Sequence, residues 1–357
     1  MGISRRHLLA GLGAAALTGR RDARAASTQY DYISCCKLAD GDFAVALLSR
    51  KGDLRATLTL PARGHDAAIS PDGRSAVVFA RRPGRFAIIL DLQSGTIVGS
   101  FAPPPGRHFY GHGVFSSDGR QLITTENDYE QERGLLGRYE VGTGYRPLPA
   151  FDSRGIGPHQ VILLRDGQTL AVANGGIATH PDFPRQKLNL ATMAPNLTLI
   201  DLASGNLVER AALPNVYHQL SLRHLVEAGD ASLWIGGQYE GPLAGSPPTV
   251  ARFQLGRGLQ LLDARRDHGR AMKGYIGSLA CSRGGERVAM TSPRGGQVTI
   301  WDVLTGRQIE AFARPDVCGV AARGAHFLFS TGQGCVHWHQ GRNDLSPIQF
   351  DNHLRAL

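Results

Sequence analysis

The 357-residue sequence contains few of the features that mark several common protein classes. Aromatic residues make up only 7% of the chain and charged residues 19%. Apart from a short N-terminal segment, no apolar run approaches the roughly 20 residues that a helix needs to cross a bilayer, so we expect no transmembrane segment in the mature chain. Basic residues form no dense cluster outside that segment, and we therefore expect no nucleic-acid partner.

Cysteine is scarce and odd in number, and its five positions are Cys35, Cys36, Cys281, Cys318 and Cys335. No pair has the C-x-x-C spacing of a redox or haem-attachment motif, and no zinc-finger spacing occurs. A chain of this length buries a core without disulfide staples. We expect these cysteines to be small buried strand residues with at most one or two bridges, whose pairing the sequence leaves open.

Familiar catalytic motifs are also missing. The chain has no Gly-x-Ser-x-Gly nucleophile elbow, no His-Glu-x-x-His helix and no phosphate-binding loop. Whether the protein is an enzyme therefore stays open.

The first 25 residues have the pattern of a targeting peptide. A paired arginine at Arg5 and Arg6 precedes a short apolar run, and Ala23-Arg24-Ala25 supplies a small-x-small cleavage site. A weakly apolar, Gly/Ala-rich run after two arginines favours the twin-arginine pathway, which exports folded proteins, often with a cofactor already bound. We expect a periplasmic mature chain of residues 26–357.

Glycine and proline are abundant, 45 and 19 residues, and they punctuate a repeat. The turns Ser70–Arg74 and Ser116–Arg120 lie between alternating apolar runs, which predicts tight β-hairpins. Seven units begin near Tyr30, His65, His112, His159, His218, Tyr275 and Val317. Their spacing of about 47 residues predicts one all-β domain, a seven-bladed β-propeller of the WD40/YVTN-like type with four-stranded antiparallel blades. Six and eight blades are the competing counts.

Four consecutive units begin with a histidine, and these are His65, His112, His159 and His218. Each lies at the start of an expected innermost strand, so closure of the ring would gather them at one end of the propeller. Their distances from the following turn glycine differ, which requires a bulge or a longer turn in some units. His326, His337, His339 and His353 are expected at outer or last-blade positions, with structural or solvated roles.

Enlarged polar loops follow the second strands of units three to five and should converge on the same end. They add the candidate metal ligands Glu126, Asp128, His180 and Asp182 to the four histidines. They and the neighbouring strands also supply candidate cofactor-binding residues, namely Asn127, Asn174, Lys187, Asn189, Arg223, His224 and Gln238. Imidazoles with one or two carboxylates suit iron, copper or zinc. The alternative interpretation is that glycine-flanked histidines cap strand ends and bind no ligand.

Long motifs in these loops resemble a bacterial family, the domain-of-unknown-function family numbered 1513. The resemblance is carried by Gly111–Ser116, Glu126–Tyr129, Gly157–His159, Val172–Ile177, His180–Asp182, Lys187–Asn189 and Gln219–Leu225. It implies a twin-arginine-exported propeller associated with iron-acquisition proteins, including imelysin-like and dihaem peroxidase-like partners. The repeats also resemble, as fold analogy only, propellers of the methylamine dehydrogenase heavy-chain and lactonase type.

Three functions therefore remain in view. The first is a monomeric periplasmic propeller that binds iron, another transition metal or a cofactor at one mouth of its channel and assists iron uptake. The second is a non-catalytic platform that docks periplasmic iron-handling proteins. The third is a lactonase-like hydrolase.

Overall fold

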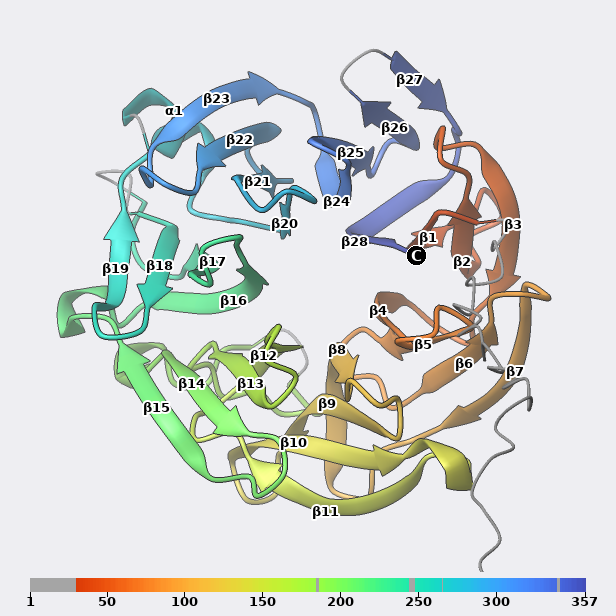
Figure 1. The fold of residues 1–357 in the computed structure, drawn as a ribbon, viewed down its shortest axis with the longest axis horizontal. Helices are drawn as coiled ribbons and strands as arrows, with labels where there is room; N and C mark the ends of the chain where they lie inside the picture. Colours follow the sequence, from red (N-terminus) through yellow and green to blue (C-terminus); the bar gives the residue numbers. More distant parts are fainter. Residues whose placement is uncertain (1–29, 184–185, 244–247, 265, 339–340) are drawn as a thin grey trace, which may run out of the picture.

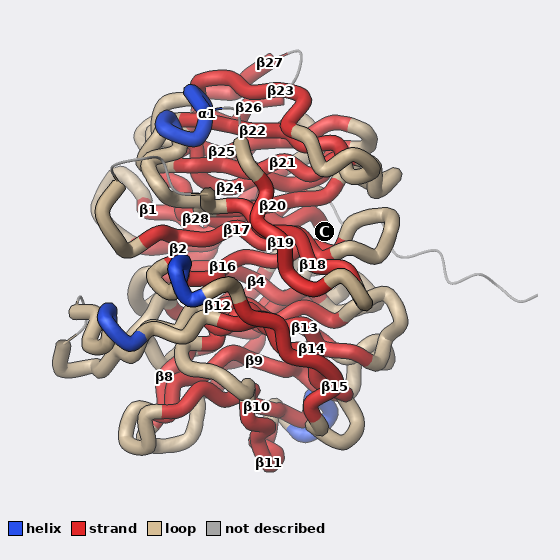
Figure 2. The backbone as a smooth tube through the Cα atoms, turned by 90° about the vertical axis from the view of Figure 1, so that its left-hand side faces the viewer, coloured by secondary structure: helices blue, strands red, loops and turns tan. Residues whose placement is uncertain are grey.

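A computed structural model describes residues 30–183, 186–243, 248–264, 266–338 and 341–357. Seven four-stranded antiparallel sheets surround a common axis like the blades of a propeller (Figure 1), which confirms the predicted fold and blade count. Seen from the side, the strands cross the disc and the loops gather at its two faces (Figure 2). The predicted targeting peptide and His339 lie outside the described residues.

Every blade has its innermost strand at the axis and three further strands outward from it. Blade one contains, in that order, β28 (Gln349–Ala356), β1 (Tyr32–Lys37), β2 (Phe43–Leu48) and β3 (Leu54–Thr59). Blade two contains β4 (Gly64–Ile69), β5 (Ser75–Ala80), β6 (Ala87–Asp91) and β7 (Thr96–Phe101). Blade three contains β8 (Arg107–Phe115), β9 (Gln121–Asp128), β10 (Arg133–Glu140) and β11 (Arg146–Asp152). Blade four contains β12 (Pro158–Leu163), β13 (Thr169–Asn174), β14 (Asn196–Asp201) and β15 (Leu207–Ala212).

The remaining blades follow the same order. Blade five contains β16 (Leu220–Glu227), β17 (Leu233–Tyr239), β18 (Val250–Gln254) and β19 (Gly258–Leu262). Blade six contains β20 (Ser278–Cys281), β21 (Arg287–Ser292), β22 (Gln297–Asp302) and β23 (Gln308–Ala313). Blade seven contains β24 (Val317–Arg323), β25 (His326–Thr331), β26 (Cys335–Trp338) and β27 (Gly341–Asp344). Short helical turns are η1 (Val141–Thr143), η2 (Leu190–Thr192), η3 (Asn215–Tyr217) and α1 (Arg266–Ala271).

The two ends of the chain close the ring together. The last strand, β28, pairs with β1 and becomes the innermost strand of blade one, with Tyr32 opposite Ala356. The hydroxyl of Ser34 donates a hydrogen bond of 2.6 Å to the carbonyl oxygen of His353 across this seam. Tyr30 therefore precedes the second strand of its blade, and the innermost strand comes from the far end of the sequence.

The predicted hairpin turns form as their residues dictate. In blade two, the Ser70 hydroxyl donates to the Asp72 carboxylate at 2.6 Å and accepts a hydrogen bond from the Ser75 amide. Blade three repeats this arrangement with Ser116 and Asp118. These side chains satisfy backbone groups that leave the sheet ladder, which holds the innermost and second strands in register.

Apolar side chains pack between neighbouring blades. Trp234 of β17 and Trp301 of β22 are fully buried with ring centroids 6.0 Å apart, so they join blades five and six. Trp338, the third tryptophan of the chain, also lies within a strand, β26. All five cysteines are free thiols. Among the described residues, no helix is long and apolar enough to cross a membrane.

Candidate metal centre

The innermost strands are irregular at the points where they carry histidine. In β4, His65 and Asp66 lie opposite a single residue of β5, because the register shifts between Gly64 and Ala67. Similar shifts occur in the innermost strands of blades one, three, four and five, at or beside His353, His112, His159 and His224. A bulge turns a side chain away from the regular alternation of a strand. The predicted bulges are therefore present.

Five histidines meet near the axis, one from each of blades one to five, and we call them the histidine ring: His65, His112, His159, His224 and His353. Around the ring, the centroids of successive imidazoles lie 4.6 Å (His65–His353), 4.7 Å (His353–His224), 4.7 Å (His224–His159), 5.1 Å (His159–His112) and 5.0 Å (His112–His65) apart. Each of the five lies three or four residues before the end of its strand. Segments from both ends of the chain thus supply one compact cluster.

Gly111 makes room for this convergence. Its φ of +104° is a conformation that other residues rarely adopt, and a Cβ there would lie 2.6 Å from Cδ2 of His65. The bulge that turns His112 toward the axis therefore depends on a residue without a side chain.

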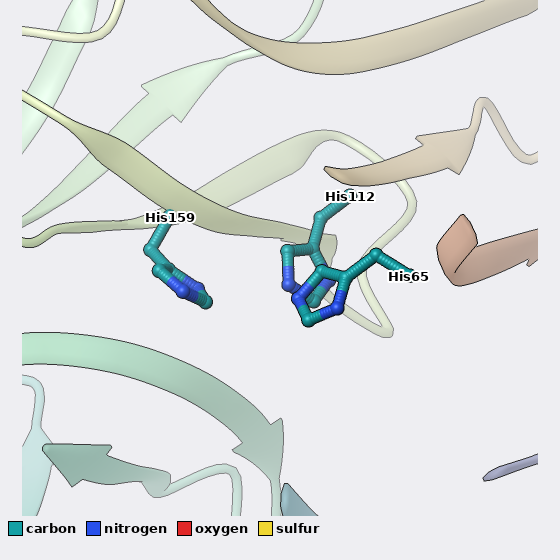
Figure 3. A group of neighbouring side chains, drawn as sticks. All are labelled: His65, His112 and His159. Carbon is teal, nitrogen blue, oxygen red and sulfur yellow. The ribbon is translucent and has the colours of Figure 1, made fainter. Parts of the chain in front are cut away.

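Three predicted ligands, His65, His112 and His159, belong to the ring (Figure 3). His218 does not, because it follows η3 before β16 begins, and its Nδ1 lies 3.0 Å from the carbonyl oxygen of Asn215. Blade five instead contributes His224, which the sequence suggested as a cofactor-binding residue. The expectation that His353 lies at an outer or last-blade position is wrong, since β28 is an innermost strand.

Burial keeps these imidazoles uncharged. Removal from water lowers the pKa of His112 to about 4, although its hydrogen bond to Asp66 acts in the opposite direction. Burial likewise lowers the pKa of His65, and holds the pKa values of His159, His224 and His353 well below the usual range. Neutral imidazole is the form that binds metal ions.

Two buried carboxylates orient two of the rings. Oδ2 of Asp66 lies 2.7 Å from Nδ1 of His112, and Oδ1 of Asp351 lies 3.1 Å from Nδ1 of His65. Burial alone would raise the pKa of Asp66, but the Arg355 guanidinium and His112 hold it well below the ordinary value. The pKa of Asp351 is lowered in the same way, because the His65 hydrogen bond and the charges of Arg81 and Arg63 outweigh burial.

Ionised carboxylates only accept hydrogen bonds, so Nδ1 of His65 and of His112 must carry a proton. The free lone pair of each ring is then on Nε2. This carboxylate–histidine pairing is the one that typically orients metal-bound imidazoles and raises their basicity.

Several ring nitrogens have no hydrogen-bond partner among the described residues. They are Nε2 of His112, Nδ1 of His159, Nδ1 of His224 and Nε2 of His353. Two overlapping trios can each place their ligand atoms within 4.8 Å of one another: His65, His112 and His159, and His112, His224 and His353. Buried polar atoms are rarely left unpaired in proteins. The arrangement therefore fits a nitrogen-ligated metal ion.

A cavity of about 330 Å³ opens onto the ring. Its lining residues are Arg63, His65, Arg81, Arg82, Tyr110, His159, Lys187, Arg223, His224, Gln238, Tyr275, Arg294 and Asn352. We call this the axial cavity. Lys187 reaches it from the loop between β13 and β14, so the predicted convergence of loops and histidines at one end is observed for this loop.

The predicted acidic ligands lie elsewhere. Glu126 is buried within blade three, where it accepts hydrogen bonds from Thr124, Tyr139 and Arg107 and fills the space beside Gly137. Asp128 pairs with Arg133 at 3.2 Å. These carboxylates lie at the end of β9 and point into or beside their own blade, so the structure does not bring them to the histidine ring.

His180 and Asp182 pair with each other at 3.6 Å in the loop after β13. Asp182 is exposed, and the His180 ring packs against Tyr129 of blade three. The loop therefore holds this pair away from the five convergent histidines.

The predicted cofactor-binding residues divide into two groups. Lys187, Arg223, His224 and Gln238 line the axial cavity. Asn127, Asn174 and Asn189 instead fix the backbone. The Asn127 amide donates to the carbonyl oxygen of Thr179 at 2.8 Å, Asn174 donates to that of Ser153 at 3.0 Å, and Asn189 donates to that of Gly176 at 2.9 Å.

Sequence reasoning missed several residues of this site, and these residues lie at similar positions in their blades. Arg81 and Arg82 follow the second strand of blade two, and Arg294 follows the second strand of blade six. Long polar loops are conspicuous in a sequence, whereas one or two arginines in a short loop are not. An arginine side chain nevertheless reaches the axial cavity from a short loop as well.

Comparison with known proteins agrees with the fold. The family model described as "Protein of unknown function (DUF1513)" matches residues 58–357. No curated protein matches the chain.

Among solved structures, Kuenenia stuttgartiensis hydrazine synthase is similar, with a TM-score of 0.64, 14% identity and coverage of 90% of this chain and 97% of that one. The β-propeller domain of Myceliophteria thermophila Cps50 (Swd1) gives a TM-score of 0.58, 13% identity, and coverage of 90% and 97%. A functionally unknown protein from Desulfotomaculum acetoxidans gives a TM-score of 0.51, 12% identity, and coverage of 80% and 88%. At these identities the likeness concerns the fold alone.

Proposed function

The chain belongs to the DUF1513 family of proteins of unknown function, and we propose that it is a metal-binding propeller whose histidine ring holds one transition-metal ion. One observation carries the proposal: five neutral imidazoles converge, and four of them present a buried ring nitrogen without a hydrogen-bond partner among the described residues. If these histidines only capped strand ends, their ring nitrogens would form hydrogen bonds with the backbone of neighbouring blades.

The donor set narrows the class of ion. Imidazole nitrogens suit iron, copper, zinc and nickel, whereas magnesium and calcium prefer oxygen ligands. Asp66 and Asp351 are already engaged by arginines and by the outer nitrogens of His112 and His65, so the expected direct ligands are nitrogen only. Rings fixed on strands of a closed propeller favour a rigid site.

The cellular role is proposed on other grounds. The twin-arginine pattern at Arg5 and Arg6 supports a periplasmic protein that folds before export. The resemblance of its loop motifs to a family found beside iron-acquisition proteins supports an accessory role in iron or other metal handling. Iron is therefore the first ion to supply.

The test measures metal content after supply of Fe(II), Cu(II), Zn(II) or Ni(II) to metal-free protein, followed by desalting. We expect about one ion per chain for at least one of these metals, and loss of that ion in His112→Ala and His112→Gln. His218→Ala is the matched control, because His218 lies just before the innermost strand of blade five but outside the ring. Equal metal content in the His112 and His218 variants would overturn the proposal, as would absence of binding in the parent protein.

Loss of folding is separated from loss of ligands by a second measurement. Thermal unfolding of the metal-free variants reports the fold, and the midpoint of His112→Gln should stay close to that of the parent. Nitrogen hyperfine structure in the electron paramagnetic resonance spectrum of the Cu(II)-loaded protein should report several imidazole ligands.

A further inference from the structure

The lining of the axial cavity is strongly cationic. Among the described residues that line it, six carry positive charge and none is acidic; the six are Arg63, Arg81, Arg82, Lys187, Arg223 and Arg294. Positive charges gathered around one cavity repel one another, and a bound anion would reduce that repulsion. This cluster of positive charge therefore favours the binding of a negatively charged ligand.

Two acidic residues that pair with the lining cations neutralise only part of this positive charge. Asp351 pairs with Arg63 at 2.6 Å and with Arg81 at 3.3 Å, and Glu240 pairs with both Lys187 and Arg223. Four cations thus share two carboxylates. Within the described residues no ion pair is found for the other two cations, Arg82 and Arg294.

Arg223 supplies the most specific indication. The residue is buried, with 8% of its surface exposed, and its Nε has no hydrogen-bond partner among the described residues. Burial lowers its pKa to about 10, with the charge of Arg82 acting in the same direction, so the guanidinium remains charged at neutral pH. A buried N–H donor without an acceptor is unfavourable, and a ligand oxygen would satisfy it.

The size of the axial cavity suits a small molecule. Its volume of about 330 Å³ lies at the lower end of the range for small-molecule sites. The cations approach from blades two, four, five and six, so they can contact several anionic groups at once. Arg294 also stacks on Tyr275, with the guanidinium carbon 4.9 Å from the ring centroid, and this contact holds it beside the cavity.

We propose that the axial cavity binds a small polyvalent oxyanion, a molecule with two or more carboxylate or phosphate groups, against Arg82, Arg223 and Arg294. Guanidinium groups match both kinds of oxyanion through paired N–H donors. His65, His159 and His224 line the same cavity, so an oxygen of the anion would lie next to the proposed metal ion. This contact deepens the proposed function and rests on it, whereas binding of the anion itself does not.

Isothermal titration calorimetry on metal-free protein tests the anion site without metal chelation by the ligand. Citrate and pyrophosphate are the two probes, so the experiment separates a carboxylate ligand from a phosphate one, and acetate is the monovalent control. At physiological ionic strength we expect one of the two polyvalent probes to bind about tenfold or more tightly than acetate. Absence of this preference for both probes would overturn the proposal.

Paired variants then locate the site. The double substitution Arg82→Gln and Arg294→Gln should weaken the preferred probe about tenfold or more. Arg120→Gln removes the same kind of charge from an exposed hairpin turn between β8 and β9 and should change binding less than about twofold. Equal weakening by both substitutions would indicate a general charge effect and would overturn the assignment.

The two proposals fail separately. Anion binding without metal uptake would leave the cavity assignment intact and remove the metal centre. Metal uptake without selective anion binding would leave the metal centre intact and remove the cavity assignment.

Discussion

Nδ1 of His112 lies 2.7 Å from Oδ2 of Asp66, and this contact decides which nitrogen of the most central imidazole can bind a metal. His112 belongs to both histidine trios, and its Nε2 is buried without a hydrogen-bond partner in the described parts of the chain. Arg355 holds the far side of the same carboxylate, with its Nε 2.8 Å from Oδ1. A chain of arginine, carboxylate and imidazole therefore fixes the tautomer at the centre of the ring.

Asp66→Asn should weaken metal binding. The asparagine oxygen can still accept the proton of His112 Nδ1, but without a negative charge it no longer raises the basicity of the imidazole. We expect the dissociation constant of the bound ion to rise about 10- to 100-fold in a competition titration with a metal chelator. Asp118→Asn, in an exposed turn, is the matched control and should leave the constant unchanged. Identical constants for Asp66→Asn and the parent would contradict the orienting role.

One metal ion per chain is expected, although two trios are present. Nδ1 of His112 is engaged by Asp66, so only one lone pair of this ring is available, and both trios need it. Two ions could not share that lone pair. A titration followed spectroscopically with Co(II) should reach its end point at one equivalent, and an end point at two equivalents would contradict this interpretation.

The sequence predicted the fold well because the relevant signals are local. Turns such as Ser70–Arg74 specify their own hairpins through Ser70 and Asp72, and such turns recur at blade spacing. The number of blades then follows from the repeat, since seven sheets close a ring in which the last strand completes the first blade.

The site was predicted only in part, because ring closure and bulges are not local. His353 lies near the end of the chain, and only the pairing of β28 with β1 brings it beside His65, at a centroid distance of 4.6 Å. His218 opens its unit in the sequence, which favoured it over His224 as a ligand. The strand itself begins at Leu220, and His224 lies at the same position before the strand end as His112.

Glu126→Gln should leave metal content unchanged, because the structure places this carboxylate within blade three. Its Oε1 accepts hydrogen bonds from Thr124 and Tyr139, and a glutamine oxygen can accept both. Glu126→Ala removes the acceptor from two buried hydroxyl groups and should lower the free energy of unfolding by about 1–3 kcal/mol. Loss of metal in Glu126→Gln, measured beside His218→Ala, would make this residue a candidate ligand again.

Glu126→Gln should also change how the free energy of unfolding depends on pH. Burial raises the pKa of Glu126 above its ordinary value of 4.5, although hydrogen bonds from Tyr139 and Thr124 oppose this. The folded protein therefore binds the proton more tightly than the unfolded chain, and the contribution of Glu126 to stability falls as pH rises above 4.5. Urea unfolding at several pH values should show that Glu126→Gln gains stability relative to the parent between mildly acidic and neutral pH. A constant difference across that range would contradict the prediction.

Gly111→Ala should disturb the histidine ring through one atom. The added Cβ would lie 2.6 Å from Cδ2 of His65, and φ at this position is +104°, so both the backbone and the neighbouring imidazole must shift. Gly119→Ala is the matched control, because its φ of +69° is also positive but the nearest atom lies 3.6 Å from the added Cβ. Both variants should lose about 1–2 kcal/mol in the free energy of unfolding because of the positive φ, and Gly111→Ala should lose more because of the contact with His65.

Only Gly111→Ala should also weaken metal binding, since it displaces His65 from the first trio. If the two variants bound metal equally well, the position of His65 would not matter to the ion, and the ligand set would have to be confined to the trio of His112, His224 and His353.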